Sequence, residues 1–429
     1  MQRRIGKFEL AAAIANDSAS FTLVGVLELE NAPSLEVIRE SLDILQKHHP
    51  ALRTRIVPDG PSYVFESFDI PKIPLTVLDR QDENLWISSV ESCLNNPVAW
   101  RKGPLLECTY LKNPDPSGVS EIIFSFHHSI VDANSLVSFL NDFLTLCASR
   151  QSGHLINGFE GYPAFPPVEE LFPSPYKGVK MMFKTAIYMM RQMASEMSFM
   201  IRTKGKRKPP LDVNSVVKIL TMHLSEEETE AVEREARKHK VTLNSVQHAA
   251  ILTATWKHLY KHETMPMKYI LFQNLRPYLE PPLNKDILGC YITMIQLMTN
   301  MDVNRNFWDL CQEINQSVFQ AGKSGEKFIS AALSGNLIKM LFRLKAFRIA
   351  VTAMNYSGPI SLQQSYGDIR VAGVRGFVSN FGLGPEFSAQ TLMFKGKLFW
   401  NILYLETDMN EATAKMIADE IKGLLVAKA

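Results

Sequence analysis

The chain has 429 residues, enough for two domains or two large lobes that each bury a core. Its hydrophobic fraction of 46% and charged fraction of 21% are those of an ordinary globular protein. The formal net charge of +2 gives no reason to expect nucleic acid or a strongly acidic partner. Five scattered cysteines form no CxxC pair, which favours a reduced compartment and argues against a zinc site built on cysteine.

The first residues combine basic and apolar side chains but are not expected to form a secretory signal. Lys7 and Glu9 interrupt the apolar run, and residues 10–15 are too short for a signal core. No stretch approaches the roughly 20 apolar residues of a membrane span. We therefore expect a cytoplasmic protein, with peripheral attachment to a membrane as an open alternative.

Residues 1–165 form the first predicted lobe, in which strands and helices alternate. The strand at 105–111 is expected to pair with the next strand, at 121–126. His48 and His49 end a helix beside Pro50, so we expect a solvated helix terminus there. The pattern predicts an α/β fold of the layered α+β type. Other predicted strands are 21–30, 52–57, 63–67 and 73–78, and the helices are 34–47 and 83–94.

The segment 121–135, EIIFSFHHSIVDANS, is the candidate functional stretch of this lobe. A buried strand ends in His127 and His128, and strand geometry places these two rings on opposite faces. His128 is expected on the face of Phe124 and Phe126, where a neutral imidazole could take a proton from a hydroxyl or an amine.

Asp132 follows His128 by four residues and could fix its ring in two ways. It could bond to the ring directly, or it could hold the loop that carries the ring. Asn134 or Ser135 is expected to cap the helix that follows. Paired histidines at a strand end are also common as hydrogen-bonded structural groups, so a purely structural role is the alternative.

Residues 166–210 are predicted to link the lobes. Residues 176–201 hold seven methionines together with Lys180, Lys184 and Arg191, and the basic segment RTKGKRKPP follows. This pattern is typical of an amphipathic helix on a membrane surface or a lipid-like substrate. The alternative is a methionine-rich helix packed on the protein's own core.

Residues 211–429 form the second predicted lobe. His258 and His262 are spaced like helical metal ligands but have no third ligand nearby, so no metal site is expected. Ser225 and Glu228 predict a capping box, and Asn410 predicts the cap of the last helix. The predicted strands are 216–224, 268–274, a segment near 292, 371–374, 391–394 and 397–404, and helices are predicted after Ser225, after residue 241, and at 306–319 and 410–426.

These motifs together resemble the thioester-dependent acyltransferases that share the chloramphenicol acetyltransferase fold. That superfamily includes condensation domains of nonribosomal peptide synthetases, polyketide-associated acyltransferases, wax-ester and alcohol acyltransferases, and plant BAHD enzymes. Its HHxxxDG signature corresponds to residues 127–133, with Ala133 in place of glycine. The flanking segments that are similar are HHPALRTRI, GPLLECTYL, VTLNSVQHAA, NLRP, DILGCYITMIQL, NYSG and, in part, NFGLG.

The resemblance implies two similar lobes of mixed sheets and helices, with an active-site tunnel at their interface. It implies that His128 is the general base, and that Asp132 is structural and forms a salt bridge with Arg276. His127 is then also structural. The resemblance leaves the donor to the oxyanion open, and the neighbourhood offers four candidates for substrate or oxyanion contacts: Asn355, Ser357, Asn380 and Gly382.

The resulting functional hypothesis is a stand-alone acyltransferase. It would move an acyl group from a thioester to the hydroxyl or amine of a small-molecule or lipid-like acceptor, in natural-product or lipid biosynthesis. Acyl-CoA is the favoured cosubstrate because no carrier-protein domain is recognised in the sequence, and no tightly bound cofactor is expected. The alternatives are a condensation enzyme that uses an acyl carrier protein and forms an amide or ester, and a non-catalytic docking member of the same fold.

Overall fold

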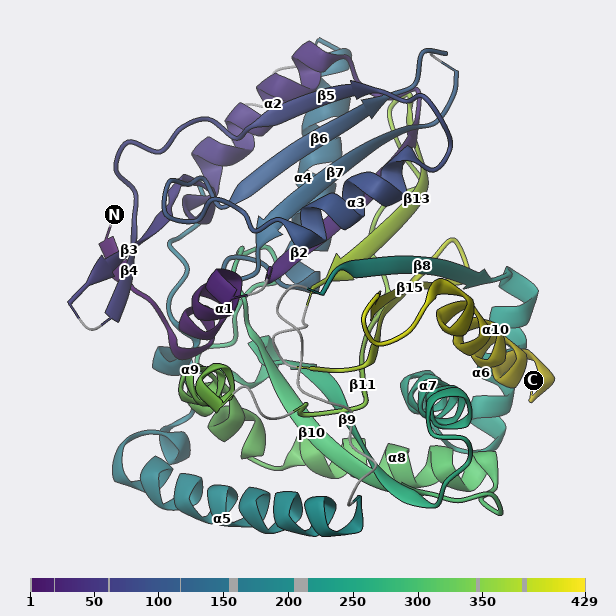
Figure 1. Cartoon of the computed structure of the whole chain (residues 1–429). Helices are drawn as coiled ribbons and strands as arrows, with labels where there is room; N and C mark the ends of the chain where they lie inside the picture. Colours follow the sequence, from purple (N-terminus) through teal and green to yellow (C-terminus); the bar gives the residue numbers. More distant parts are fainter. Residues whose placement is uncertain are drawn as a thin grey trace. The chain divides into compact units, whose positions relative to one another are not determined.

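The computed structural model describes residues 2–18, 20–60, 62–115, 117–153, 161–203, 215–344, 348–379 and 384–428. Its contacts divide the chain into two compact units. The first comprises Met1–Leu171, Pro281–Tyr291 and Pro359–Asn380, and the second comprises Phe172–Glu280, Ile292–Gly358 and Phe381–Ala429. The predicted mixed α/β fold is confirmed in both units (Figure 1).

The first unit is built on a six-stranded sheet with the strand order β12-β13-β2-β7-β6-β5, beside a small sheet with the order β1-β4-β3. The predicted pairing of β6 with β7 is confirmed, and it is antiparallel. Its elements are β1 (Gln2–Arg4), α1 (Lys7–Ser18), β2 (Thr22–Glu30), α2 (Leu35–His48), β3 (Arg55–Asp59), β4 (Ser62–Glu66), β5 (Leu75–Asp79), α3 (Leu85–Asn95), β6 (Leu106–Lys112), β7 (Ser120–His127), α4 (Ala133–Gln151), β12 (Ser365–Tyr366) and β13 (Ile369–Val378), with short 3-10 turns at Pro50–Arg53 and Val168–Leu171.

Helices cover both faces of the six-stranded sheet of the first unit (Figure 1). On one face Phe124 and Phe126 of β7 pack edge-on against Phe139 of α4. On the other face Trp86 of α3 lies beside Phe377 of β13. Because strand residues alternate between faces, β7 is buried along its whole length between these layers.

The second unit is built on another six-stranded sheet, with the strand order β10-β9-β11-β14-β15-β8. The predicted capping box of Ser225 and Glu228 and the predicted cap at Asn410 are both confirmed. Its elements are a 3-10 turn at Ser174–Tyr176, α5 (Gly178–Arg202), β8 (Val217–Leu224), α6 (Glu226–Lys238), α7 (Leu243–Leu259), β9 (Met265–Asn274), a 3-10 turn at Arg276–Tyr278, β10 (Ile292–Met301), α8 (Phe307–Lys323), α9 (Glu326–Leu344), β11 (Thr352–Pro359), β14 (Phe387–Phe394), β15 (Lys397–Leu405) and α10 (Glu411–Ala427).

The main core of the second unit lies between its sheet and the helices α6, α7, α8 and α10. Tyr269 of β9 faces this core and contacts His248 of α7. Its neighbour Lys268 points to the opposite face, where it bonds to Glu196 of α5. The helix α5 therefore belongs to the layer on the far side of the sheet.

Three observations differ from the expectations, and a fourth decides between the two interpretations of the methionine-rich helix. Residues 281–291 and 359–380 pack with the first unit rather than with the second predicted lobe. The segment 7–18 forms α1, for which no element was predicted, because its alanine-rich run lacks a clear helical period. The solvated terminus expected at His49 is wrong, because that ring is buried and stacks on Tyr162. Six of the seven methionines of α5 are exposed, so they do not pack into the core.

Candidate active site in the first unit

The loop after β7 carries the candidate site. β7 ends at His127, and a tight turn brings the chain to Asp132, which caps α4. One carboxylate oxygen of Asp132 accepts the backbone N–H of Ser135 at 3.0 Å. The cap expected at Asn134 or Ser135 is therefore wrong, because Asp132 already accepts the exposed N–H group of the first helical turn.

The second carboxylate oxygen of Asp132 accepts the backbone N–H of Tyr291 at 2.9 Å. Asp132 is fully buried, so these two N–H groups replace water around its charge. Neither bond goes to the ring of His128. Of the two expected modes of action, the geometry therefore fits the one in which Asp132 holds the loop.

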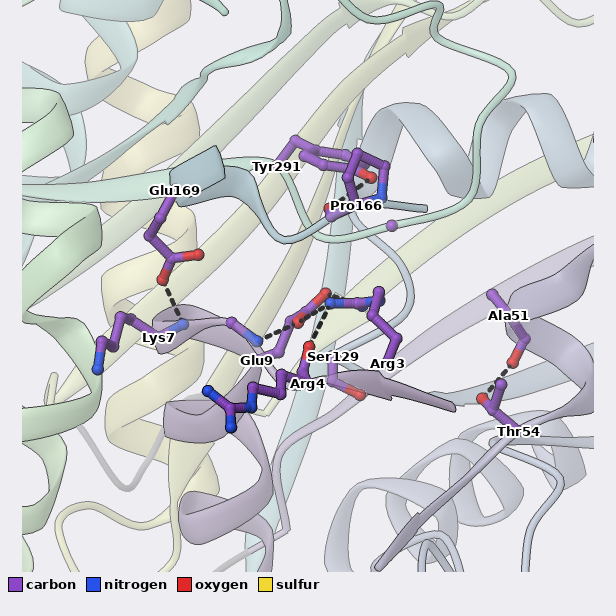
Figure 2. A network of polar contacts seen from close by, with 12 residues as sticks. Arg3, Arg4, Lys7, Glu9, Ala51, Thr54, Ser129, Pro166, Glu169 and Tyr291 are labelled. Carbon is purple, nitrogen blue, oxygen red and sulfur yellow. Dashed lines mark hydrogen bonds and ion pairs between the residues drawn. The ribbon is translucent and has the colours of Figure 1, made fainter. Parts of the chain in front are cut away.

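The segment 287–291 seals the start of α4. Ser135 Oγ donates to the carbonyl oxygen of Gly289 at 3.0 Å, and the N–H of Gly289 lies 3.3 Å from the same hydroxyl. A Cβ atom at Gly289 would lie 2.3 Å from the Tyr291 ring. Tyr291 also donates its hydroxyl to the carbonyl oxygen of Pro166 at 3.2 Å (Figure 2). Glycine is thus required for the buried ring to fold back over the segment.

The tautomer of His128 follows from one contact. Its Nδ1 atom lies 2.7 Å from the carbonyl oxygen of Val131. Because a carbonyl can only accept a hydrogen bond, Nδ1 carries the proton and Nε2 keeps a free lone pair. Among the described residues, no hydrogen bond to Nε2 is found. The ring is therefore oriented as a proton acceptor.

The surroundings of His128 are mostly apolar. Phe21 stacks on the ring at 5.0 Å between centroids, and Phe8 meets it edge-on at 6.3 Å. The Cys290 sulfur lies 3.7 Å from Nδ1. Burial lowers the pKa of His128, while the Val131 carbonyl and the charge of Asp132 oppose this shift. Burial therefore favours the neutral form of the ring.

His127 is held in a different way. Its Nδ1 atom accepts the backbone N–H of Ser129 at 3.2 Å and lies 2.7 Å from the hydroxyl of that residue. Burial, with a smaller contribution from His128, lowers the pKa of His127 to about 3. The described residues place no hydrogen-bond partner at its buried Nε2 atom. His127 is therefore a neutral, buried side chain that shapes the turn.

Helix α1 brings Phe8 to His128. Polar contacts anchor the first turn of this helix (Figure 2). Glu9 forms two hydrogen bonds with the guanidinium of Arg3, at 2.7 and 3.0 Å, and accepts the N–H of Gly6. Glu169 accepts the N–H of Lys7. Burial raises the pKa of Glu9 despite the nearby Arg3 charge. Because loss of either partner would leave an unpaired buried charge, this ion pair stabilises the position of the first turn of α1.

The remaining predicted site residues belong to the second unit or lie outside the described residues. Arg276 is buried in the second unit, where its N–H bonds to Asn274, and its pairing with Asp132 stays a prediction. Asn355 and Ser357 lie on β11 and bond to each other at 3.2 Å. Asn380 and Gly382 lie outside the described residues. Their roles as substrate or oxyanion contacts are untested.

A metal site finds no support in the part of the chain that the structure describes. No group of three or more potential metal ligands occurs there. Helix α7 ends at Leu259, so His262 lies beyond the helix and not one helical turn after His258. Trp256 meets the His262 ring edge-on at 4.9 Å.

Among the same described residues, no helix is both long and apolar enough to cross a membrane.

Several contacts of the site could not be found from the motif alone. The Val131 carbonyl was not expected to fix the tautomer, because backbone acceptors leave no trace in a sequence pattern. Phe8 and Cys290 lie far from His128 in sequence, at 120 positions before it and 162 after it. The segment that contains Cys290 is similar to a family element. This similarity indicated that the segment matters, but it did not indicate that Cys290 lies beside His128.

Comparisons with known proteins agree with this architecture. The model of the Condensation domain family matches residues 1–328. A plipastatin synthase polypeptide of Bacillus subtilis (strain 168) is 25% identical over 138 residues, which are 32% of this chain and only 5% of that protein.

Two solved structures share the fold over nearly the whole chain. Trichothecene 15-O-acetyltransferase TRI3 from Fusarium sporotrichioides is similar with a TM-score of 0.79 at 15% identity, covering 100% of this chain and 95% of that one. Polyketide synthase associated protein 5 from Mycobacterium tuberculosis is similar with a TM-score of 0.70 at 16% identity, covering 99% and 97%. Because the family match extends over most of the chain and includes the HHxxxD loop, the chain belongs to the Condensation domain family.

Proposed function

We propose that this protein is an acyltransferase that moves an acyl group from a thioester to a hydroxyl or amine, with His128 as general base. The observation that carries the proposal is the fixed tautomer of His128. Its Nδ1 proton is held by the Val131 carbonyl, which leaves Nε2 available for a proton. Membership of the Condensation domain family supports this class of reaction.

In the proposed reaction, Nε2 of His128 removes the proton of the acceptor hydroxyl or amine as its oxygen or nitrogen attacks the thioester carbonyl carbon. A tetrahedral intermediate forms, and its carbon–sulfur bond then breaks. The imidazolium returns the proton to the departing thiolate. The product is an ester or amide plus a free thiol, and no covalent enzyme intermediate is required.

The loop that carries His128 stabilises the imidazolium that forms briefly during the reaction. The Val131 carbonyl accepts from Nδ1 throughout, and the buried Asp132 charge lies close enough to raise the pKa of the ring. Phe21 and Phe8 limit contact of the ring with water. A weakly basic, preoriented imidazole suits proton transfer near neutral pH.

Acyl-CoA is the proposed donor, and an acyl carrier protein is the second candidate. The second is favoured by the match of the chain to the Condensation domain model and to a plipastatin synthase polypeptide. Similarity to trichothecene 15-O-acetyltransferase supports a hydroxyl acceptor. Both donors present the same thioester, so His128 would act identically on either.

The test supplies purified protein with acetyl-, octanoyl- and palmitoyl-CoA, and in parallel with the same acyl groups on a phosphopantetheinylated carrier protein. A panel of alcohols and amines serves as acceptors, and released thiol and acylated product are measured. His128→Ala should lower turnover by about a hundredfold or more. His223→Gln, which changes an exposed histidine on β8, is the matched control and should leave turnover unchanged.

Each result has a definite meaning. Turnover of the carrier-bound donors alone would replace acyl-CoA by the second candidate. An unchanged rate for a folded His128→Ala variant would refute the role of His128. Absence of turnover with every donor and acceptor, in protein that retains its circular dichroism, would favour a non-catalytic docking protein.

A further inference from the structure

Helix α5 exposes a continuous apolar stripe along nearly the whole of its 25 residues. The stripe begins at Val179, which is 77% exposed, and ends at Ile201, which is 70% exposed. At 3.6 residues per turn its members fill one sector about 160° wide. They share high exposure and helical spacing: Val179, Met182, Phe183, Ala186, Ile187, Met189, Met190, Met193, Ala194, Met197, Met200 and Ile201.

The opposite sector of α5 attaches the helix to the second unit. Glu196 bonds to the buried Lys268 of β9, and the Lys268 ammonium also lies 4.4 Å from the centre of the Phe199 ring. Phe199 is buried, and Arg191, which lies between this sector and the stripe, reaches Glu326 of α9 at 3.5 Å. Figure 1 shows α5 at the lower edge of this unit, beyond α9 and the strands β9 and β10. The helix is thus held in place while its stripe faces outward.

The charged side chains of α5 are not evenly distributed around the helix. Lys180, Lys184, Arg191 and Arg202 follow one border of the stripe, within a sector about 40° wide. The sequence of α5 contains a single acidic residue, Glu196, and this residue lies on the attached side. The outward half of the helix therefore combines an apolar surface with a cationic border.

We infer that α5 is a membrane-docking helix that lies flat in the interface of a bilayer with anionic lipids. Its stripe would enter the boundary between headgroups and acyl chains, and its cationic border would contact lipid phosphates. Its length would suffice to span a bilayer, yet it is not apolar enough to do so. Methionine side chains, which adapt their shape, suit a fluid partner.

A lipid surface fits these observations better than a protein partner. A continuous exposed apolar stripe rimmed by charged side chains marks an interaction surface. Protein interfaces pair specific polar groups on both sides, whereas this stripe consists of apolar side chains with cations along one edge. A second copy of the chain would bring the same cationic border and no acidic side chain of α5 to face it.

The experiment uses the full chain and vesicle cosedimentation. Vesicles are made of phosphatidylcholine alone or of equal parts phosphatidylcholine and phosphatidylglycerol. We expect binding to the anionic vesicles that weakens as salt rises from about 0.1 M to about 0.5 M. The triple variant Met190→Glu, Met193→Glu and Met197→Glu should bind at least about tenfold more weakly, because it places three carboxylates in the interface.

A matched control changes exposed apolar residues on other surfaces to glutamate. Phe68, Val303 and Met416 are each about half exposed or more and lie outside α5. The control triple variant should bind vesicles as the unchanged protein does. The variant Lys180→Gln, Lys184→Gln and Arg191→Gln should lose the preference for anionic vesicles but keep part of the apolar contribution.

Sedimentation velocity without lipid tests the rival hypothesis, in which a second copy of the chain covers the stripe. A monomer that binds anionic vesicles through α5 supports the inference. A dimer that the α5 triple variant dissociates, together with no vesicle binding, would assign the stripe to a second copy and overturn it. Equal vesicle binding by the α5 variant and its control would also overturn it. Since the readout is binding, its failure is independent of the proposed acyl transfer.

Discussion

The Nδ1 atom of His128 donates to the carbonyl oxygen of Val131 across 2.7 Å. A backbone carbonyl of its own turn therefore fixes the ring of the proposed base. The carboxylate of Asp132 acts indirectly, by holding that turn. This arrangement separates two tasks. The backbone sets the tautomer, while Asp132 supplies the anchors to α4 and to Tyr291 and a stabilising charge.

The pH dependence of catalysis tests the state of His128. The base is active when neutral, so kcat/KM should rise with pH and level off once the ring is deprotonated. Because burial lowers the pKa of His128, the midpoint should lie below about 6.5, the ordinary histidine value. The rate should be measured from acid to neutral pH with a donor that is stable throughout. A midpoint above the ordinary value would contradict the buried, neutral ring.

Asp132→Asn should loosen the loop. The two carboxylate oxygens accept N–H groups from Ser135 and Tyr291, whereas asparagine offers one acceptor and one donor. One N–H would then face another donor inside the protein, which should cost about 1–3 kcal/mol of unfolding free energy. The midpoint of the pH profile should also move to lower pH, because the charge that raises the pKa of His128 is gone.

The control for this variant is Asp82→Asn. Asp82 accepts one N–H, from Asn84, in an exposed turn. That change should cost less than about 0.5 kcal/mol and leave the pH profile in place. Equal losses of stability for the two variants in urea denaturation would show that the buried contacts of Asp132 do not matter.

Gly289→Ala tests the segment that seals α4. The added methyl group would lie 2.3 Å from the Tyr291 ring, so the ring or the backbone must move. We expect a loss of about 1–3 kcal/mol of unfolding free energy and reduced turnover. Gly423→Ala in α10 meets nothing within 4 Å and should stabilise the protein by about 0.5–1 kcal/mol. Urea denaturation of both variants decides whether the close contact or the loss of glycine matters.

Local patterns predicted the strand, turn and helix around the histidines because each signal is contained in a few residues. The exact cap was missed because Asp132, Asn134 and Ser135 are all good capping residues. The choice among them depends on Tyr291, which holds the other oxygen of Asp132 from 159 positions away. A sequence pattern does not contain that contact.

Long-range organisation was harder to predict for the same reason. Strand β13 was expected as a short strand of the second lobe, yet it pairs with β2 in the first unit. Alternation along a strand identifies its two faces but not its neighbours in the sheet. For α5, amphipathic spacing left two interpretations open, and only the exposure of its methionines separates them.

His248 in α7 allows a test of stability against pH. Its ring is buried, and the described residues place no hydrogen-bond partner at either nitrogen. Burial lowers its pKa to about 3, well below about 6.5 for an unfolded chain. Between these values the unfolded chain binds the proton and the folded protein does not, so stability falls as the pH falls. From pH 7 to pH 5 this one group should remove about 2 kcal/mol of unfolding free energy.

His248→Leu should abolish that part of the acid sensitivity, whereas His223→Leu on the exposed face of β8 should keep it. Urea denaturation at the two pH values measures the difference, and equal acid sensitivity of His248→Leu and the unchanged protein would contradict a neutral buried ring.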